Sequence, residues 1–211
     1  MRLLGYGEDF LTLWAINNRL KTILEEIEDI SDPEKCTIFF RPSFGRSGGE
    51  LSSQFGGFDF IIITTKGAYL GESKWDNSSE LKESSINLRD EQLLRHKLFL
   101  EYINTWLETK PQSWEDFSSN LSLKLKGINL KKNIAPLGSL LQQNIQYILK
   151  TITNSFNSCK DFKFKNVLLF LYNKNYNQSL PTKVNSKDLY FNLVCLDYSE
   201  NMDDKFIDLK L

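Results

Sequence analysis

Two acidic residues and one lysine, Asp59, Glu72 and Lys74, are the residues of this sequence whose types and spacing best suit a chemical task. Two carboxylates and the backbone carbonyl of Ser73 make a hard-oxygen site of the kind that holds Mg²⁺, with Mn²⁺ as the expected substitute. A lysine beside such an ion can orient or help deprotonate a water and stabilise negative charge on a phosphate. These are the parts that hydrolysis of a phosphodiester requires.

The strands that would position these groups form a predicted hairpin. Residues 59–65 and 68–75 are apolar runs rich in β-branched and aromatic side chains, and Lys66 and Gly67 between them favour a tight turn. Both faces of the hairpin are apolar, which is typical of strands in the middle of a sheet. Charged groups at the end of so buried a hairpin are costly unless they are paired or bind a metal.

The predicted turn also sets which residues face one another. With Lys66 and Gly67 as a two-residue turn, Asp59 lies directly opposite Lys74, and Glu72 is the diagonal neighbour. Side chains alternate along a strand with a period of two residues, so all three groups point to one face and converge within roughly 8 Å. The alternative interpretation is a structural ion pair at a strand end.

Two short segments around these residues follow a known motif. The first is Gly56-Gly57-Phe58-Asp59, an apolar strand follows it, and the second is Gly71-Glu72-Ser73-Lys74. This pattern resembles the PD-(D/E)xK nuclease superfamily, which includes type II restriction endonucleases, Holliday-junction resolvases and exonuclease domains. The predicted element order over residues 8–110, with a further strand near residue 170, is similar to that family's core. Phe58 stands in place of the name-giving proline, a variation that leaves the acids and the lysine in place.

The resemblance implies both a fold and an activity. The fold would be α/β with a restriction-endonuclease-like core, a central mixed β-sheet flanked by helices, in which Asp59 and Glu72 bind Mg²⁺ and Lys74 is the catalytic lysine. The implied activity is hydrolysis of DNA phosphodiester bonds by a restriction-type endonuclease. A Holliday-junction resolvase or DNA-repair nuclease would keep the same site, and a catalytically silent nucleic-acid-binding subunit would keep the fold alone. A homodimer would let both strands be cut, although no sequence feature demonstrates one.

Members of the family often add an acid from the first helix, and Glu8 and Asp9 are the two choices here. Apolar residues at steps of three and four predict a helix over residues 9–27 with one buried stripe. Helical phase favours Asp9, which falls on that stripe, whereas Glu8 lies about 100° away. Either acid could instead simply stabilise the helix N-terminus electrostatically.

A second helix, predicted over residues 88–107, carries polar residues on the face that should meet the sheet. Gln92 and Arg95 are in phase with its apolar stripe, which suggests contact with substrate or with water at the metal. The alternative is a helix end that emerges into solvent. Exonuclease-like members carry a Gln-x-x-x-Tyr element in the corresponding helix, and Gln92 with His96 is similar but not identical. His96 is the only histidine, and we expect a surface or packing residue rather than a general base.

Two segments are candidates for binding nucleic acid. Arg41, Ser43 and Arg46 belong to a glycine- and serine-rich region whose guanidinium groups and backbone amides could grip phosphates, although a solvated loop would have the same composition. The lysine-dense stretch 124–132 is interpreted first as a solvated face and second as a DNA contact.

The remaining elements complete an α/β sandwich with a mixed sheet. The sequence predicts a helix over residues 139–156 and strands over residues 36–41, 166–172 and 189–198. We therefore expect a single domain over residues 1–211, with 110–160 as a helical insertion that would carry specificity or dimerisation.

Bulk composition agrees with a folded chain of this kind. The 211 residues carry a formal net charge of −1, so any nucleic-acid surface must be local. The three cysteines lack metal-site spacing and are expected to be buried free thiols. We expect three of the tryptophans, Trp75, Trp106 and Trp114, to be core or interface residues. No signal segment or membrane-spanning run is recognisable, which predicts a cytoplasmic protein without a membrane partner.

Overall fold

A five-stranded mixed sheet forms the centre of the fold in the computed structural model, which describes residues 2–43, 56–125, 134–176 and 179–210. Its strand order is β2-β3-β4-β7-β9. The first two neighbouring pairs are antiparallel and the last two are parallel. The strands are β2 (Thr37–Phe40), β3 (Phe60–Ile63), β4 (Gly67–Trp75), β7 (Lys163–Tyr172) and β9 (Phe191–Asp197).

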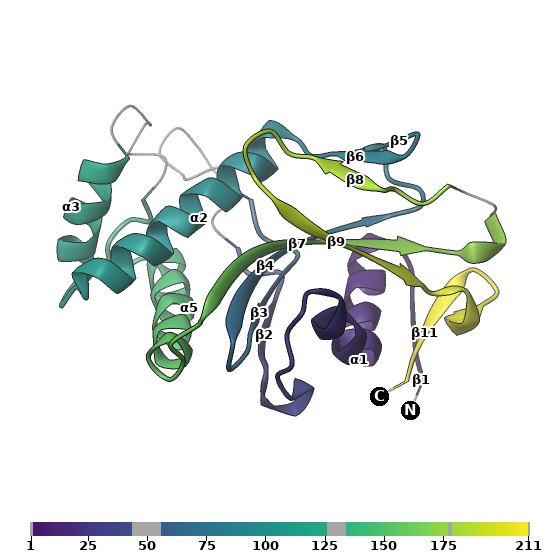
Figure 1. Ribbon diagram of the computed structural model, residues 1–211, viewed down its shortest axis with the longest axis horizontal. Coiled ribbons are helices and arrows are strands. Elements are labelled where there is room, and N and C mark those ends of the chain that lie inside the picture. The colour runs from purple at the N-terminus through teal and green to yellow at the C-terminus, as the bar shows by residue number, and fades with distance from the viewer. Residues whose placement is uncertain (1, 44–55, 126–133, 177–178, 211) are drawn as a thin grey trace.

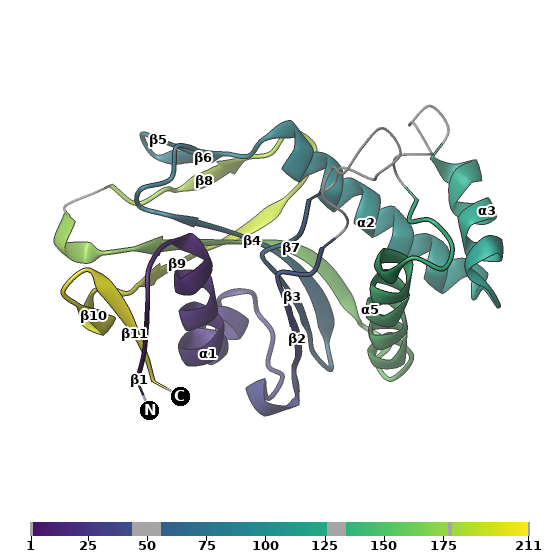
Figure 2. The same cartoon turned by 180° about the vertical axis from the view of Figure 1, so that it is seen from behind.

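Helices cover both faces of this sheet (Figures 1 and 2). Helix α1 (Glu8–Glu26) packs on one face, where its side chains join the alternate strand residues typified by Tyr69 and Leu169. The opposite face, typified by Leu70, is covered by α2 (Asp90–Thr109) and α5 (Leu140–Asn157), and α3 (Trp114–Lys124) packs on α2. The α/β class with a mixed sheet flanked by helices is therefore confirmed.

Two small sheets flank this core and were not predicted. One has the order β1-β11-β10 and the other β5-β6-β8. Strands of two to five residues carry too few alternating positions to be recognised in a sequence. Their bounds are β1 (Arg2–Gly5), β5 (Leu81–Lys82), β6 (Ser85–Asn87), β8 (Lys183–Asn185), β10 (Met202–Asp203) and β11 (Phe206–Lys210), and the short helical turns are η1 (Pro33–Lys35), η2 (Lys174–Tyr176) and η3 (Ser199–Asn201).

Two helices, α3 and α5, lie in the described part of the segment between α2 and β7. Helix α5 lies within one residue of its predicted bounds, whereas α3 was not predicted separately. Trp114 of α3 is buried and donates its indole N–H to the carbonyl of Ala135. Trp106 is buried as well, so these two tryptophans are core residues, whereas Trp75 is only half-buried.

Helix α1 confirms the first predicted helix but differs in its buried face. Leu11, Trp14 and Leu24 are at most 1% exposed, whereas Leu13 and Leu20 of the predicted stripe are only partly buried. Arg19 has non-helical backbone angles (φ −125°, ψ 15°), so one stripe does not continue through the whole helix. A phase calculated from a straight helix is therefore wrong at the first turn.

The β3–β4 hairpin forms, but its register differs by two residues from the prediction. Ile63 pairs with Ala68, and the two-residue turn consists of Thr65 and Lys66 rather than Lys66 and Gly67. The reason is the Thr64 side chain, whose Oγ1 accepts hydrogen bonds of 2.9 Å from both the Lys66 and the Gly67 amides. The ladder ends with Phe60 opposite Gly71, and Asp59 lies just beyond it, with its backbone N–H bonded to the Gly71 carbonyl over 3.1 Å. Asp59 is therefore not paired with Lys74, although both residues line the same cavity.

The other global predictions have simpler outcomes. All three cysteines are free, but they are half-buried rather than fully buried. None of the helices in the described part of the chain combines the length and the apolar character needed to cross a membrane.

Candidate active site

Glu72 lies on β4 at the end of the apolar hairpin and is 1% exposed. Its side chain meets α2, because β4 residues of even number face that helix. Gln92 Nε2 donates to Glu72 Oε2 over 2.9 Å, and Arg95 Nη2 donates to Oε1 over 2.5 Å. His96 Nε2 lies 3.3 Å from the same Oε1. Three side chains of one helix thus contact both oxygens of a buried carboxylate, and Arg95 is its counter-charge.

Gln92 and Arg95 therefore do not emerge into solvent. They are 5% and 8% exposed. Two hydrogen bonds fix the orientation of the Gln92 side chain. Its Oε1 accepts the backbone N–H of Arg89 at the helix N-terminus over 3.0 Å, and its Nε2 donates to Glu72. The polar interruptions of the α2 stripe are explained by this one carboxylate.

His96 is the residue of this cluster whose role the sequence did not reveal. It is fully buried, its ring packs edge-on against Phe58 and Phe191, and its Nδ1 lies 2.7 Å from Asn166 Oδ1. His96 is thus a packing residue, one of the two roles expected from the sequence, and it also contacts Glu72. Its spacing of four residues from Gln92, which puts both on one helical face, could have indicated this.

The surroundings of Glu72 keep it ionised. Burial alone would raise its pKa, but the hydrogen bond from His96 and the charge of Arg95 outweigh that effect and lower the pKa to about 2. A carboxylate that holds its charge at neutral pH is a constant negative centre next to Asp59.

Asp59 immediately precedes β3 and faces the same cavity. Its Oδ2 accepts the backbone N–H of Ser73 over 2.8 Å, whereas Oδ1 accepts no hydrogen bond from the residues that the structure describes. Burial, followed by repulsion from Glu72, raises the pKa of Asp59 to about 6. The negative charges of Asp59 and Glu72 therefore repel each other whenever both carboxylates are ionised.

Lys74 connects the sheet to α1. Its Nζ is 2.7 Å from the carbonyl oxygen of Ser73 and 3.3 Å from Glu8 Oε1, and its side chain is 4% exposed. Burial raises the pKa of Glu8, and the Lys74 charge opposes that rise. Glu8, not Asp9, is thus the acid of the first helix that approaches Lys74.

Asp9 has a different partner. Its side chain is 63% exposed and forms an ion pair with Arg41, so the preference for Asp9 from helical phase is wrong in this geometry. The physical reason is the packing of α1 at its first turn, where Glu8 meets the end of β4 and Asp9 turns outwards.

These residues line one polar cavity of about 430 Å³. Three arginines, Arg41, Arg89 and Arg95, are among its walls, and so is Glu91. Gly56 and Gly57 form another part of the wall, and a side chain at Gly57 would come within 2.8 Å of the Pro42 carbonyl oxygen. The lining consists of Glu8, Arg41, Gly56, Gly57, Asp59, Glu72, Lys74, Arg89, Glu91, Gln92 and Arg95.

The donors at this cavity fit Mg²⁺ in part. Asp59 and Glu72 supply carboxylate oxygens and Ser73 a carbonyl, and Mg²⁺ needs few protein ligands because it keeps several waters. The raised pKa of Asp59 reflects negative charge that a cation would compensate. Against this, no ready-made group of three or more His, Cys, Asp or Glu ligands exists among the described residues, and α2 already bonds both oxygens of Glu72.

The remaining predicted contacts lie elsewhere. Ser43 is exposed and forms an isolated bridge with Gly57, outside the cavity lining. Arg46 lies outside the described residues, as do positions 126–132 of the lysine-dense stretch. Lys124 pairs with Glu108 on the α2–α3 side of the molecule.

Comparison with known proteins adds no relative. No protein-family model, no curated protein and no solved structure matches this chain. The functional argument therefore depends on the geometry of the site.

Proposed function

We propose that this protein is a Mg²⁺-dependent nuclease that hydrolyses DNA phosphodiester bonds, most simply as a restriction-type endonuclease with a restriction-endonuclease-like core. One observation carries the proposal: Asp59, Glu72 and Lys74 line a single polar cavity at the end of the most buried strand pair. Structural ion pairs do not require a cavity beside them, whereas a substrate does.

In this proposal Asp59, Glu72 and the carbonyl of Ser73 hold the ion. When bound, Mg²⁺ supplies a Lewis acid that stabilises negative charge on the phosphate. Asp59 would bind the ion through Oδ1, because Oδ2 already accepts the backbone N–H of Ser73. Gln92 and Arg95 orient Glu72, and His96 and Arg95 keep it ionised.

Lys74 assists at the phosphate. An ammonium group has three N–H donors, and Glu8 and the Ser73 carbonyl accept two of them. The third can donate to a water or to a phosphate oxygen. Glu8 acts as a positioning residue, because its carboxylate holds the lysine at the cavity wall. Arg41 and Arg89 add positive charge for the substrate backbone.

The test is cleavage of supercoiled plasmid and labelled oligonucleotides with Mg²⁺, Mn²⁺ or chelator. Asp59→Asn and Lys74→Met should each lower the rate by at least about 100-fold. Asp161→Asn and Lys66→Met are matched controls, because both residues are exposed and outside the cavity. Cleavage that survives both test variants, or persists in chelator, would rule out the mechanism.

Two other functions are distinguished by substrate. A panel of linear duplex, four-way junction and flap DNA separates a restriction-type enzyme from a Holliday-junction resolvase or a repair nuclease. DNA binding without cleavage of any substrate, with either metal, would favour a catalytically silent nucleic-acid-binding subunit.

A further inference from the structure

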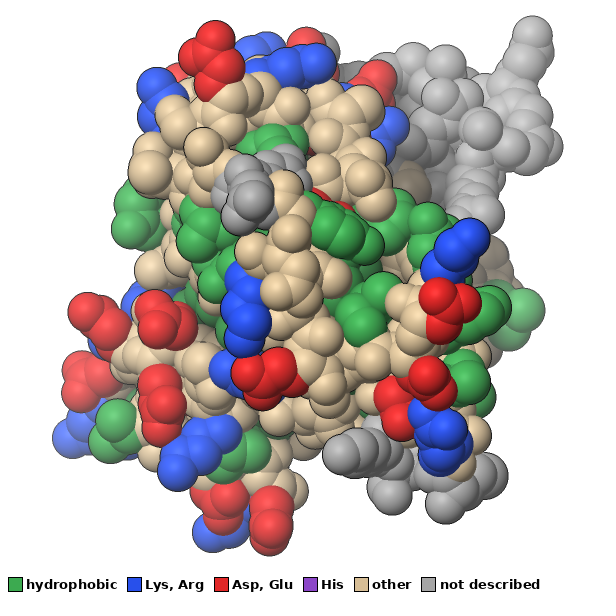
Figure 3. All heavy atoms as spheres, turned by 90° about the vertical axis from the view of Figure 1, so that its right-hand side faces the viewer, with side chains coloured by type: hydrophobic (Ala, Val, Ile, Leu, Met, Phe, Trp, Pro, Cys, Tyr) green, Lys and Arg blue, Asp and Glu red, His purple; other side chains and the backbone are tan. Residues whose placement is uncertain are grey.

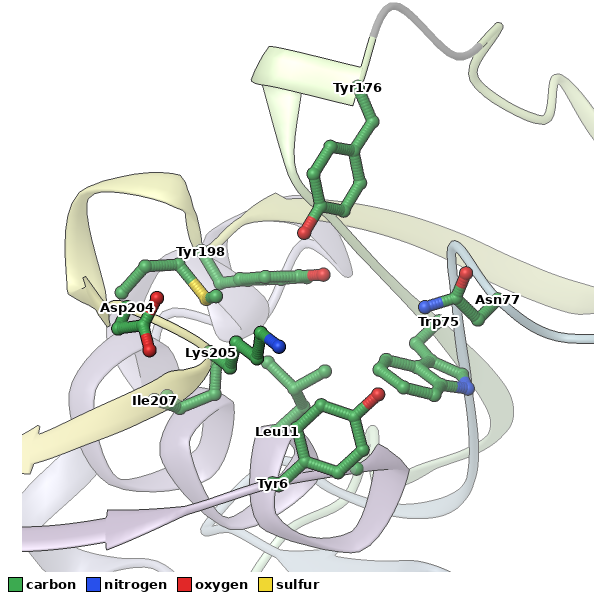
Figure 4. A pocket seen from close by; sticks show the side chains of 11 residues that line it. Tyr6, Leu11, Trp75, Asn77, Tyr176, Tyr198, Asp204, Lys205 and Ile207 are labelled. Atoms are coloured by element: carbon green, nitrogen blue, oxygen red, sulfur yellow. The ribbon is translucent and has the colours of Figure 1, made fainter.

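A second pocket, of about 270 Å³, lies on the α1 side of the sheet at the carboxyl ends of β4, β7 and β9. Four aromatic rings line it: Tyr6, Trp75, Tyr176 and Tyr198. In Figure 4 these side chains surround a common space, and the Lys205 ammonium is directed towards it. Figure 3 shows hydrophobic side chains gathered in the middle of the face that carries β10 and β11. None of these rings belongs to the site described above.

The inner wall of this pocket is rigid. Tyr198 is 2% exposed and donates its hydroxyl to Asp76 Oδ2 over 2.8 Å. The same Asp76 oxygen accepts the backbone N–H of Asn173 over 3.0 Å, which joins the ends of β4, β7 and β9. The orientation of the Tyr198 ring is therefore fixed before any ligand binds.

The outer wall is exposed. Tyr6 is 65% exposed and Tyr176 is 56% exposed, although large aromatic side chains are usually covered. Tyr6 packs edge-on against Trp75 with ring centroids 5.6 Å apart. Two exposed rings that face a fixed ring across a pocket can enclose a flat molecule between them.

The size and polarity of the pocket define its ligand. Drug-sized ligands occupy pockets of about 300–1,000 Å³, so this one is suited to a single small ring system. Its rim carries hydrogen-bonding groups, the Asn77 amide and Asp204, and the Lys205 ammonium, which forms no ion pair within the part of the chain that the structure describes. A flat ring with a polar edge and a nearby negative charge meets all of these conditions.

The pocket is adjacent along the chain to the candidate active site. Gly7 and Trp75 line the pocket, whereas their neighbours Glu8 and Lys74 line the catalytic cavity. Lys74 and Trp75 point to opposite faces of the sheet, so the two sites lie on either side of the end of β4 and the start of α1. A strand of nucleic acid that passes around this end can therefore reach both.

We propose that this pocket binds the base of an unpaired nucleotide close to the phosphodiester held at Asp59 and Glu72. The inference rests on the proposed nuclease function and names its substrate class: DNA with an unstacked base. Base stacking on aromatic side chains is the usual way in which proteins hold such bases. Lys205 contacts the phosphate of the same nucleotide.

The test uses single-stranded oligonucleotides that contain 2-aminopurine, in chelator, so that binding is measured without cleavage. Stacking quenches the fluorescence of this base. Wild-type protein should quench it, and Tyr6→Ala and Tyr176→Ala should each weaken the binding about fivefold or more. Tyr147→Ala is the matched control, because Tyr147 of α5 is also 65% exposed and packs edge-on against one ring, Phe39 of β2.

Each outcome decides between the two proposals. Equal quenching by Tyr6→Ala, Tyr176→Ala and Tyr147→Ala, or no quenching by the wild type, would overturn the nucleobase pocket. Equal binding of a fully paired duplex would overturn the preference for an unpaired base. If quenching follows the pocket variants but plasmid cleavage is absent, the pocket stands and the nuclease proposal fails. If cleavage requires Asp59 and Lys74 but quenching is unchanged in the tyrosine variants, the nuclease proposal stands and the pocket proposal fails.

Discussion

Glu72 and Arg95 form an ion pair that is shut away from solvent, with 2.5 Å between Oε1 and Nη2 and side chains that are 2% and 9% exposed. Removing one partner of a buried pair leaves the other charge without compensation. The pair therefore contributes to the stability of the fold as well as to the site. The effect of removing it should be measured both on the free energy of unfolding and on cleavage.

We expect Arg95→Met to lower the free energy of unfolding by about 3–5 kcal/mol, because the buried Glu72 carboxylate loses its main counter-charge. Urea unfolding measures the effect. Lys97→Met is the control on the same helix, since Lys97 is exposed and pairs with exposed Asp188. Its effect should stay within about 0.5 kcal/mol. The double variant Glu72→Gln with Arg95→Met should lose less free energy of unfolding than the two single variants lose in sum. If the two losses simply add, the two residues do not interact.

The two acids at the start of α1 should differ in their effect on metal binding. Glu8→Gln removes the carboxylate that holds Lys74, and we expect Mn²⁺ affinity or cleavage rate to fall about 10- to 100-fold, as for other groups that position a metal site. Asp9→Asn should change both much less, because Asp9 is exposed and approaches the cavity only through its ion pair with Arg41, which lines it. Calorimetric titration with Mn²⁺ and plasmid cleavage measure the two quantities. A larger loss from Asp9→Asn than from Glu8→Gln would reverse the assignment.

Asp59 should make the metal-free protein less stable as pH rises. Its pKa is about 6 in the folded protein and 3.8 ordinarily, so between these values the folded state binds more protons than the unfolded chain. Stability falls with pH wherever that is true, and the loss is complete above pH 6. Asp59→Asn should therefore stabilise the metal-free protein at pH 8 by up to about 3 kcal/mol, and by much less at pH 4.

Thermal unfolding from pH 4 to pH 8 in chelator measures this difference, with exposed Asp161→Asn as the control. Added Mg²⁺ should remove the advantage of Asp59→Asn, because the ion compensates the same charge. A stabilisation that is independent of pH would contradict the raised pKa.

Thr64→Val should destabilise the β3–β4 hairpin by about 1–3 kcal/mol. The threonine oxygen accepts two turn amides and donates to Asp29 Oδ2 over 2.7 Å, and valine of similar shape can do neither. Thr65→Val is the control, because the neighbouring Thr65 is exposed and its hydroxyl contacts that of Ser31 at the surface. Urea unfolding compares the two. If both variants lose the same stability, the turn is not organised by Thr64.

The local elements and the faces of the site followed from the sequence. Alternation with a period of two residues puts Glu72 and Lys74 on one face of β4 in either register, and Asp59, which precedes β3, lines the same cavity. Helical spacing likewise put Gln92 and Arg95 on the side of α2 that meets the sheet. Periodicity is a local property, so it can be read without knowing what packs against each element.

The tertiary structure decided the contacts between these elements. The Thr64 side chain selected the register, and the bend at Arg19 and the packing of α1 brought Glu8 rather than Asp9 to Lys74. Whether Glu72 would be bonded by His96 depended on how α2 crosses β4.

The aromatic pocket depended entirely on the order of the parallel strands. It gathers Tyr6, Trp75, Tyr176 and Tyr198 from four distant parts of the sequence, and no periodic pattern relates them. Sequence patterns thus determined which groups share a face, because that depends on backbone geometry alone. Packing between elements determined which groups meet, because that depends on side chains far apart in the chain.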